Sequence, residues 1–218
     1  MSQLNKAILH GTVWSILGQF GTMFVTLIAN IVLARFLTPY EFGQVGVIMF
    51  FIILANVLTE SGLAGALVRE KEVTRDDYST VFVFNLILST VCFIILVASS
   101  GFISAFYDDS SLQSILIVSA LILFINAFQI TQNARLMRDL KFKQKSKYRF
   151  IAVCLGSIMG IALAISGLGV WSLIIMQLLT ALFTTLILWY YEGGFFSLTF
   201  KKDSFKSLYS FGVNTTLA

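Results

Sequence analysis

Six long apolar stretches are the feature of this 218-residue chain that most restricts its fold. Each has about the twenty residues that a helix needs to cross the hydrocarbon core of a bilayer. They lie at residues 12–34, 43–67, 79–103, 112–134, 149–168 and 170–191. Backbone polar groups in lipid must bond within the protein, which leaves helices or a closed barrel, and these stretches lack the alternation of barrel strands. The sequence therefore predicts an all-α, polytopic membrane helix bundle with six transmembrane helices.

The positions of the fifteen Lys and Arg residues predict how these helices are oriented. Fourteen lie before the first stretch, in the second and fourth loops, or after the last stretch: Lys6; Arg69, Lys71, Arg75; Arg135, Arg138, Lys141, Lys143, Lys145, Lys147, Arg149; Lys201, Lys202, Lys206. Loops rich in Lys and Arg stay in the cytoplasm. We therefore expect a multi-pass protein of the cell (inner, cytoplasmic) membrane, in contact with membrane lipids, with both termini in the cytoplasm.

Composition supports the membrane interpretation and argues against several other functions. The mean hydropathy is +0.87 and only 12% of the residues are charged, whereas about a quarter are charged in soluble domains. The confinement of the basic residues to loops accounts for the pI of 9.1, so we expect no nucleic-acid partner. For the basic segment 135–149, orientation of the helices and contact with anionic headgroups both stay open. The sequence carries no enzyme or dinucleotide motif, so we expect no catalytic residue, metal site or cofactor.

Local signals mark several helix starts and one packing face. Residues 38–41, Thr-Pro-Tyr-Glu, form a predicted capping box with the chain's single proline at the first helical position. Residues 74–77 and 110–113 repeat the pattern before the third and fourth stretches. Gly156 and Gly160 give the fifth stretch a face of small residues, which permits a close approach of another helix. Cys92 and Cys154 lie within apolar stretches and are interpreted as small core residues.

Polar residues recur on one face of several predicted helices. The first helix carries Ser15, Gln19, Thr22, Thr26 and Asn30; the others contribute Asn56, Asn85, Ser89, Asn126, Gln129, Asn133, Gln177, Thr180 and Thr184. Hydrogen bonds between helices would explain isolated members of this set. A shared hydrated cavity would explain the longer rows, because polar groups in the membrane are costly unless they face protein or water. The candidate cavity residues are Gln19, Thr26, Asn30, Asn56, Asn126, Gln129 and Asn133, together with Arg35.

Two charged residues in or beside the apolar stretches each permit two interpretations. Glu60 is the one acid well inside a stretch; it either carries a coupling ion, as a proton, or caps the helix end near the headgroups. Arg35 is the one basic residue on the side expected to lie outside. It either binds an anionic group such as a phosphate or extends its side chain to the membrane surface.

The end of the chain differs from the six-helix part. We expect residues 1–192 to form an N-terminal transmembrane lobe and residues 193–206 a cytoplasmic linker. Residues 207–218 weakly match the start of the chain, with an apolar turn, a glycine and a run containing Val and Thr after a lysine. We therefore expect them to begin a seventh helix, the truncated start of a second lobe, in a chain that is a fragment.

Three segments carry a resemblance to a known family. Residues 33–43, Leu-Ala-Arg-Phe-Leu-Thr-Pro-Tyr-Glu-Phe-Gly, resemble the signature after the first helix of polysaccharide export proteins. Residues 60–63 and 66–73 resemble the end of that family's second helix, and residues 134–142 resemble the basic exit of its fourth. These proteins are the O-antigen, colanic-acid and teichuronic-acid flippases of the multidrug/oligosaccharidyl-lipid/polysaccharide transporter superfamily.

The resemblance implies one lobe of a two-lobe transporter, with the C-terminal lobe missing from this chain. Such a transporter flips an undecaprenyl-pyrophosphate-linked oligosaccharide for surface polysaccharide or lipopolysaccharide biosynthesis, by alternating access. In that picture Arg35 and the polar face of the first helix lie near the cavity and meet the pyrophosphate or the sugar. Two alternatives stay open, a multidrug or cation antiporter of the same superfamily and a membrane subunit or scaffold without transport of its own.

Overall fold

The computed structural model describes residues 3–59, 63–70, 73–193, 198–202 and 204–206. The regular structure in these residues is helical: α1 (Gln3–Leu33), α2 (Pro39–Thr59), α3 (Leu63–Arg69), α4 (Arg75–Phe106), α5 (Ser111–Arg138), α6 (Phe142–Ile165) and α7 (Val170–Glu192). All of these except the seven-residue α3 are long and apolar enough to cross a membrane. The predicted all-α bundle with six membrane-spanning helices is therefore confirmed.

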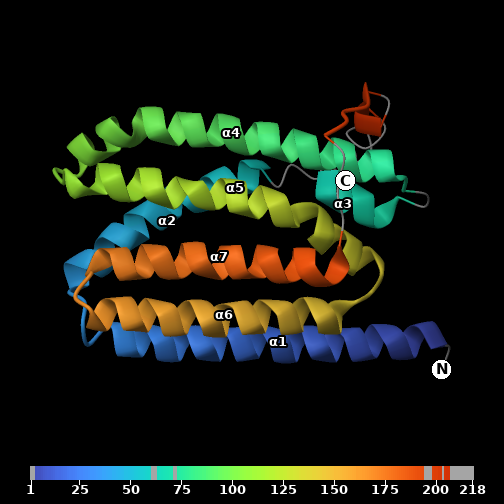
Figure 1. The fold of residues 1–218 in the computed structure, drawn as a ribbon, viewed down its shortest axis with the longest axis horizontal. Coiled ribbons are helices and arrows are strands. Elements are labelled where there is room, and N and C mark those ends of the chain that lie inside the picture. The colour runs from blue at the N-terminus through green and yellow to red at the C-terminus, as the bar shows by residue number, and fades with distance from the viewer. Residues whose placement is uncertain (1–2, 60–62, 71–72, 194–197, 203, 207–218) are drawn as a thin grey trace.

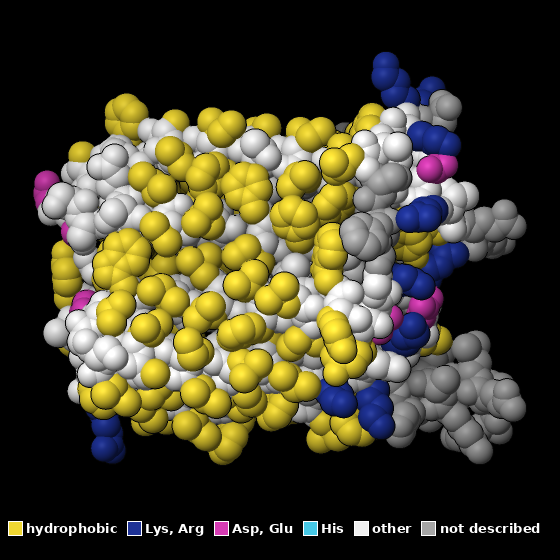
Figure 2. All heavy atoms as spheres, in the orientation of Figure 1, with side chains coloured by type: hydrophobic (Ala, Val, Ile, Leu, Met, Phe, Trp, Pro, Cys, Tyr) yellow, Lys and Arg dark blue, Asp and Glu magenta, His cyan; other side chains and the backbone are white. Residues whose placement is uncertain are grey.

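Successive long helices run in opposite directions along the bundle, so that their ends fall into two groups (Figure 1). The α4–α5 and α6–α7 hairpins lie side by side through α5 and α7, and α1 packs on the outer side of α6. Lys and Arg gather at the end where α1, α4 and α6 begin, which we call the basic end, and hydrophobic side chains cover the middle (Figure 2). The end where α2, α5 and α7 begin is called the opposite end. This grouping follows the alternation of charge along the sequence.

Three of the predicted helices have clearly different bounds in the structure. α1 begins at Gln3 and not at residue 12. The stretch expected as one helix over 43–67 is divided into α2, which ends at Thr59, and α3, which begins at Leu63. Glu60 lies between them, outside the described residues. α6 begins at Phe142 and not near residue 149, so most of the basic segment is helical. Lys, Arg and Gln are good helix formers, and their charges do not prevent helix formation where the segment reaches water.

The predicted capping boxes are present at two of three helix starts. The Thr38 N–H donates to the Glu41 carboxylate at 2.7 Å, and the Glu41 N–H donates back to Thr38 Oγ1 at 3.3 Å. Thr74 and Asp77 form the same reciprocal pair before α4. The third prediction is wrong, because Ser110 has a helical backbone and makes no capping bond. Residue 109, an aspartate, takes that role.

The side chain of Asp109 joins the start of α2 to the start of α5 at the opposite end. Its carboxylate accepts hydrogen bonds from the Ser111 hydroxyl at 2.6 Å, from Gln44 Nε2 at 2.6 Å and from the Tyr40 hydroxyl at 2.7 Å. These donors, with Ser111 the largest contributor, hold the pKa of the Asp109 carboxyl well below its usual range. Because Tyr40 and Gln44 belong to α2, the loop between α4 and α5 is tied to the start of α2.

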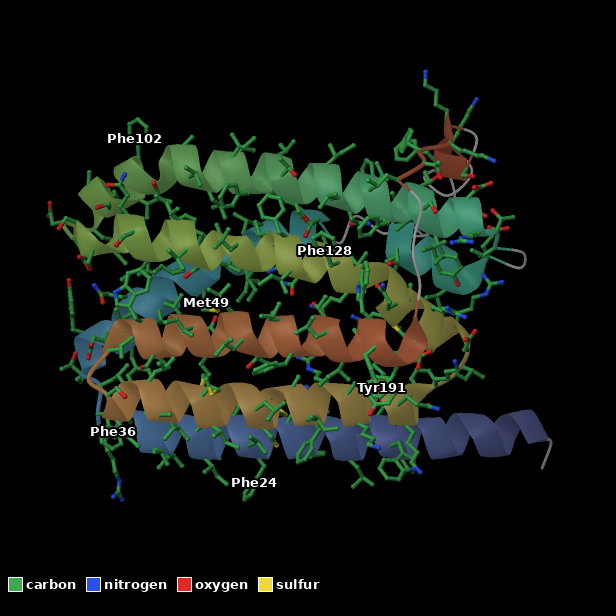
Figure 3. All side chains as sticks on the ribbon, viewed as in Figure 1. Phe24, Phe36, Met49, Phe102, Phe128 and Tyr191 are labelled. Carbon is green, nitrogen blue, oxygen red and sulfur yellow. The ribbon has the colours of Figure 1, made fainter. Side chains whose placement is uncertain are left out.

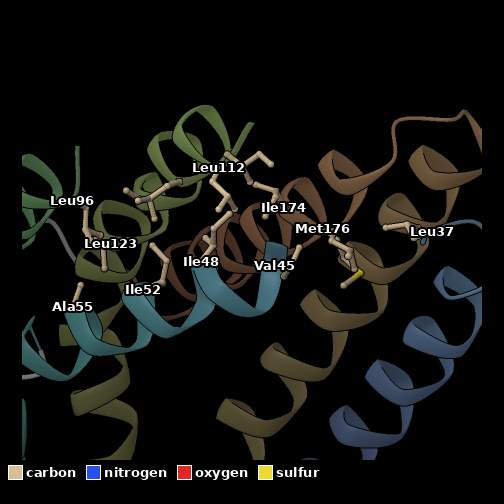
Figure 4. Packing of buried hydrophobic residues seen from close by; sticks show 14 of the residues in the cluster. Leu37, Val45, Ile48, Ile52, Ala55, Leu96, Leu112, Leu123, Ile174 and Met176 are labelled. Atoms are coloured by element: carbon tan, nitrogen blue, oxygen red, sulfur yellow. The ribbon is translucent and has the colours of Figure 1, made fainter. Parts of the chain in front are cut away.

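The apolar core forms where α2 crosses the two hairpins. Ile48 and Ile52 of α2 are almost fully buried and lie in one cluster with Leu123 of α5 and Ile174 of α7 (Figure 4). Phe24 and Phe102, in contrast, point away from the bundle (Figure 3) and are 63% and 81% exposed. Large apolar side chains on the outside are expected where the surrounding solvent is lipid.

The predicted small-residue face of α6 makes a close approach to α7. A Cβ atom added at Gly156 would overlap Thr180 Oγ1 and lie 3.2 Å from the Met176 carbonyl oxygen. A Cβ atom added at Gly160 would lie 2.6 Å from Met176 Cβ. Close backbone contact of this kind is how helices gain van der Waals energy in lipid, where no hydrophobic force drives them together.

Gly156→Ala is expected to destabilise the bundle by about 1–3 kcal/mol, because the added methyl group forces α6 and α7 apart. The measurement is thermal unfolding of the purified protein in detergent. Gly46→Ala is the matched control, since a Cβ atom at Gly46 meets nothing within 4 Å and alanine favours the helix. Equal melting temperatures for the two variants would contradict the close α6–α7 contact.

Asp109→Asn is expected to lower stability by about 1–2 kcal/mol, because it removes hydrogen bonds to a charged acceptor. The pKa of Asp109 is lower in the folded than in the unfolded protein. The ionised carboxylate therefore contributes stability above the unfolded value of about 3.9, and this contribution is lost as the pH falls towards the folded value.

In melting temperatures measured between pH 7 and pH 3, the difference between the wild type and Asp109→Asn should therefore be constant above about pH 5 and begin to shrink below about pH 4. Asp108→Asn removes the same charge from the neighbouring exposed residue, and its φ of 51° suits asparagine. That control should follow the wild type throughout. A constant difference between Asp109→Asn and the wild type over this range would refute the assignment.

Candidate functional site

A cavity of about 870 Å³ lies among the membrane-spanning helices, in the half of the bundle nearer the basic end. Its walls come mainly from α2, α5, α6 and α7, with smaller contributions from α1, α3 and α4. Met49, which Figure 3 places inside the bundle, lies towards its inner limit, and Lys145 and Met137 lie towards the basic end. A volume of this size is typical of small-molecule binding sites.

Amide side chains form a connected row along one wall of this cavity. Asn126 Nδ2 of α5 donates to Asn56 Oδ1 of α2 at 3.0 Å. Gln129 Nε2 donates in turn to Asn126 Oδ1 at 2.7 Å, and Asn133 lines the cavity one turn further along α5. Both interpretations of the polar rows therefore describe part of this wall, which joins two helices and also lines the cavity. The row leaves polar amide surface facing the space between the helices.

A second polar wall comes from α6. Lys145 and Arg149 line the cavity, and Val153 and Ser157 continue the same wall at intervals of four residues. This spacing places all four on one helix face. The lining residues that the structure describes include these two cations and no Asp or Glu. The described part of the cavity is therefore suited to an uncharged or anionic ligand.

Other cations of the same segment form contacts away from the cavity. Lys141 Nζ lies 3.1 Å from the Glu192 carboxylate, and Arg138 donates to a carbonyl of α3 at 3.0 Å. Lys143 lies over the Trp14 ring, 4.7 Å from its centroid. Lys145 and Arg149 differ from them because they line the cavity wall.

Sequence analysis alone did not single out Lys145 and Arg149 as cavity residues. They had been grouped with the basic segment as determinants of orientation, because the fifth helix was expected to begin near residue 149. The signal that could have identified them is the spacing Lys141, Lys145, Arg149, which puts three cations on one face if the helix begins earlier.

The remaining candidate residues lie at different places. Thr26 lines the cavity, whereas Gln19 and Asn30 are exposed on α1 and do not line it. Arg35 is exposed in the loop between α1 and α2, at the opposite end. Its role as an anion-binding residue, and the role of Glu60 outside the described residues, stay predictions.

Comparison with known proteins supports a link to polysaccharide biosynthesis. The sequence profile of the family described as "Polysaccharide biosynthesis protein" matches residues 32–218. An uncharacterised membrane protein in the cps region of Klebsiella pneumoniae is 22% identical over 205 residues, 94% of this chain and 42% of its own length. The succinoglycan biosynthesis transport protein ExoT of Rhizobium meliloti is 24% identical over 177 residues, 81% of this chain and 36% of its own length.

A third relative is named for teichuronic acid biosynthesis. The teichuronic acid biosynthesis protein TuaB of Bacillus subtilis is 23% identical over 147 residues, 67% of this chain and 30% of its own length. The chain thus spans less than half the length of these curated relatives. No solved structure is significantly similar to it. Because the family match covers most of the chain, this multi-pass membrane protein belongs to the polysaccharide biosynthesis protein family, as its resemblance to the polysaccharide flippases led us to expect.

Proposed function

We propose that the chain is the N-terminal lobe of a transporter that exports a lipid-linked oligosaccharide for surface polysaccharide biosynthesis. The observation that carries the proposal is the cavity, which combines a row of amides with two cations and no acid among its described lining residues. The relative ExoT, which is named as a succinoglycan biosynthesis transport protein, also supports the proposal. The orientation follows the basic residues, with the basic end in the cytoplasm.

The two walls of the cavity match the two polar parts of such a substrate. Lys145 and Arg149 of α6 provide positive charge for a pyrophosphate, and an Arg guanidinium binds phosphate oxygens through two parallel hydrogen bonds. Amides both donate and accept hydrogen bonds, which is what sugar hydroxyls require. The lipid tail needs no site in the protein, because it stays in the surrounding bilayer.

The exposed polar face of α1 supports a second lobe. Among the described helices, α1 packs only against α6. Gln19 and Asn30 are exposed on it, at depths where contact with lipid tails is unfavourable. In the proposed transporter this face meets the second lobe or the water between the lobes. Alternating access then consists of the two lobes rocking around the cavity.

The segment after α7 suits a linker to that lobe. The Lys201 N–H donates to Thr80 Oγ1 at 3.2 Å, and the Lys201 ammonium pairs with Asp76. Phe205 packs against Phe84 with ring centroids 5.0 Å apart. These contacts hold Lys201 and Phe205 against the first turns of α4. The remainder of the proposed protein would therefore enter the second lobe from the basic end.

Replacing both Lys145 and Arg149 with Gln is expected to reduce transport by the full-length protein at least tenfold, because both positive charges on the cavity wall are lost. Transport is measured as restored surface polysaccharide in a strain that lacks its own flippase. The same double variant of a cation antiporter would keep or gain cation efflux, so drug resistance is measured in parallel.

Lys147→Gln is the matched control. Lys147 carries the same charge two residues from each member of the pair, is exposed, and does not line the cavity. Transport should stay near the wild-type level in this variant. Failure of the well-expressed wild-type protein to restore the polysaccharide would refute the proposed function. Equal loss in the control and the double variant would refute only the assignment of the α6 wall.

A further inference from the structure

Two polar atoms in the cavity wall have no hydrogen-bond partner in the described part of the chain. They are Asn85 Oδ1 and Ser89 Oγ of α4, and each residue is only 1% exposed. Both residues line the cavity. They lie four residues apart on one face of α4, so the two atoms belong to neighbouring turns. A buried polar group without a partner is costly, and more so where lipid surrounds the protein.

The local contacts define what each group still offers to a ligand. Asn85 Nδ2 donates to the Val81 carbonyl oxygen at 2.8 Å, which leaves the amide oxygen as an acceptor. Thr90 and Thr184 donate to the carbonyl oxygen four residues earlier, the usual solution for a hydroxyl in a membrane helix. Ser89 makes no such bond. Both atoms are buried in this structure, so each side chain has to rotate about χ1 to turn its free atom towards a ligand. The pair then offers one acceptor and one hydroxyl that can both donate and accept.

An uncharged hydroxylated ligand satisfies this pair better than a cation does. A hard cation takes several oxygen ligands and usually includes a carboxylate among them. The described lining residues include no Asp or Glu. A sugar hydroxyl, in contrast, can donate to the Asn85 oxygen. It can also either accept a hydrogen bond from the Ser89 hydroxyl or donate one to it.

We propose that Asn85 and Ser89 form a glycan-binding subsite, which hydrogen-bonds hydroxyl groups of the sugar next to the pyrophosphate. This inference rests on the proposed function and adds the residues that recognise the carbohydrate. It places the phosphates at the α6 wall and the first sugars at the α4 wall of the same cavity. The amide side chains of α5 line the cavity between α4 and α6, and in this proposal they contact the same sugars.

The test measures binding of two probes to the purified full-length protein in lipid nanodiscs. One probe is polyprenyl pyrophosphate, and the other is a mixture of the same lipid carrying a single glucose, galactose or N-acetylglucosamine. The wild type should bind the sugar-bearing probe more tightly. Ser89→Ala and Asn85→Leu should each reduce this preference about threefold to tenfold, the usual effect of one lost hydrogen bond. Neither should change the affinity for the sugar-free lipid.

Ser119→Ala is the matched control. Ser119 is 4% exposed and its hydroxyl also lacks a partner in the described residues, but it does not line the cavity. All three substitutions remove an unsatisfied polar group, so thermal stability should be retained or increased in each. Only the two α4 variants should lose the preference for sugar, and Ser89→Thr, which keeps the hydroxyl, should retain it.

The outcomes separate this inference from the proposed function. If the wild type binds neither probe, the proposed function fails and the subsite with it. If the wild type binds both probes equally, or if Ser89→Ala matches Ser119→Ala in its preference, only the subsite is refuted. If the α4 variants no longer bound the sugar-free lipid, the subsite would also be refuted, because the phosphates are assigned to α6.

Discussion

Lipid offers no hydrogen-bond partners, so each polar group inside this bundle must find one in the protein, in water or in a ligand. Most hydroxyls of the helices meet this requirement locally, by donating to a carbonyl of their own helix, as Thr180 does to Met176 at 2.8 Å. Larger amides need longer-range partners, and Asn126 finds Asn56 on another helix. Three buried polar atoms remain without a partner in the described residues. Two of them, on Asn85 and Ser89, belong to residues that line the cavity between the hairpins, and the third, on Ser119, does not.

The position of α2 makes that cavity possible. At the opposite end its first turns are tied by Asp109 to the α4–α5 loop, and in the middle Ile48 and Ile52 fill the space between the hairpins. Towards the basic end α2 gives way to the short α3 after Thr59, and the cavity occupies this half of the bundle. One end of the lobe is thus closed by hydrogen bonds and apolar packing, and the other contains polar walls.

The sequence was sufficient to predict the six spanning helices, two of three caps and the amides that meet in the cavity wall. Hydropathy and i, i+4 spacing are local, and in lipid they decide secondary structure almost alone. The start of α6 was misplaced because a run of Lys and Arg looks like a loop when only hydropathy is considered. The cap at Asp109 was missed because Ser110 satisfies the same pattern, and only the contacts of α2 distinguish them. The packing of segments that are distant in the sequence decides where such a helix starts and which residue caps it.

The distribution of charge in the proposed transporter has a consequence for its mechanism. Cations attract the pyrophosphate at the basic end through Lys145 and Arg149, whereas the inner part of the described lining is uncharged. The anionic head group is therefore favoured at the entrance, beside these two cations, and moving it inward costs electrostatic energy. Hydrogen bonds from the glycan to α4 and α5 offset part of that cost in the proposed complex. The remainder has to come from the second lobe or from a coupled ion, which is why a lobe with this cavity is expected to bind its substrate alone but to transport it only as part of the longer protein.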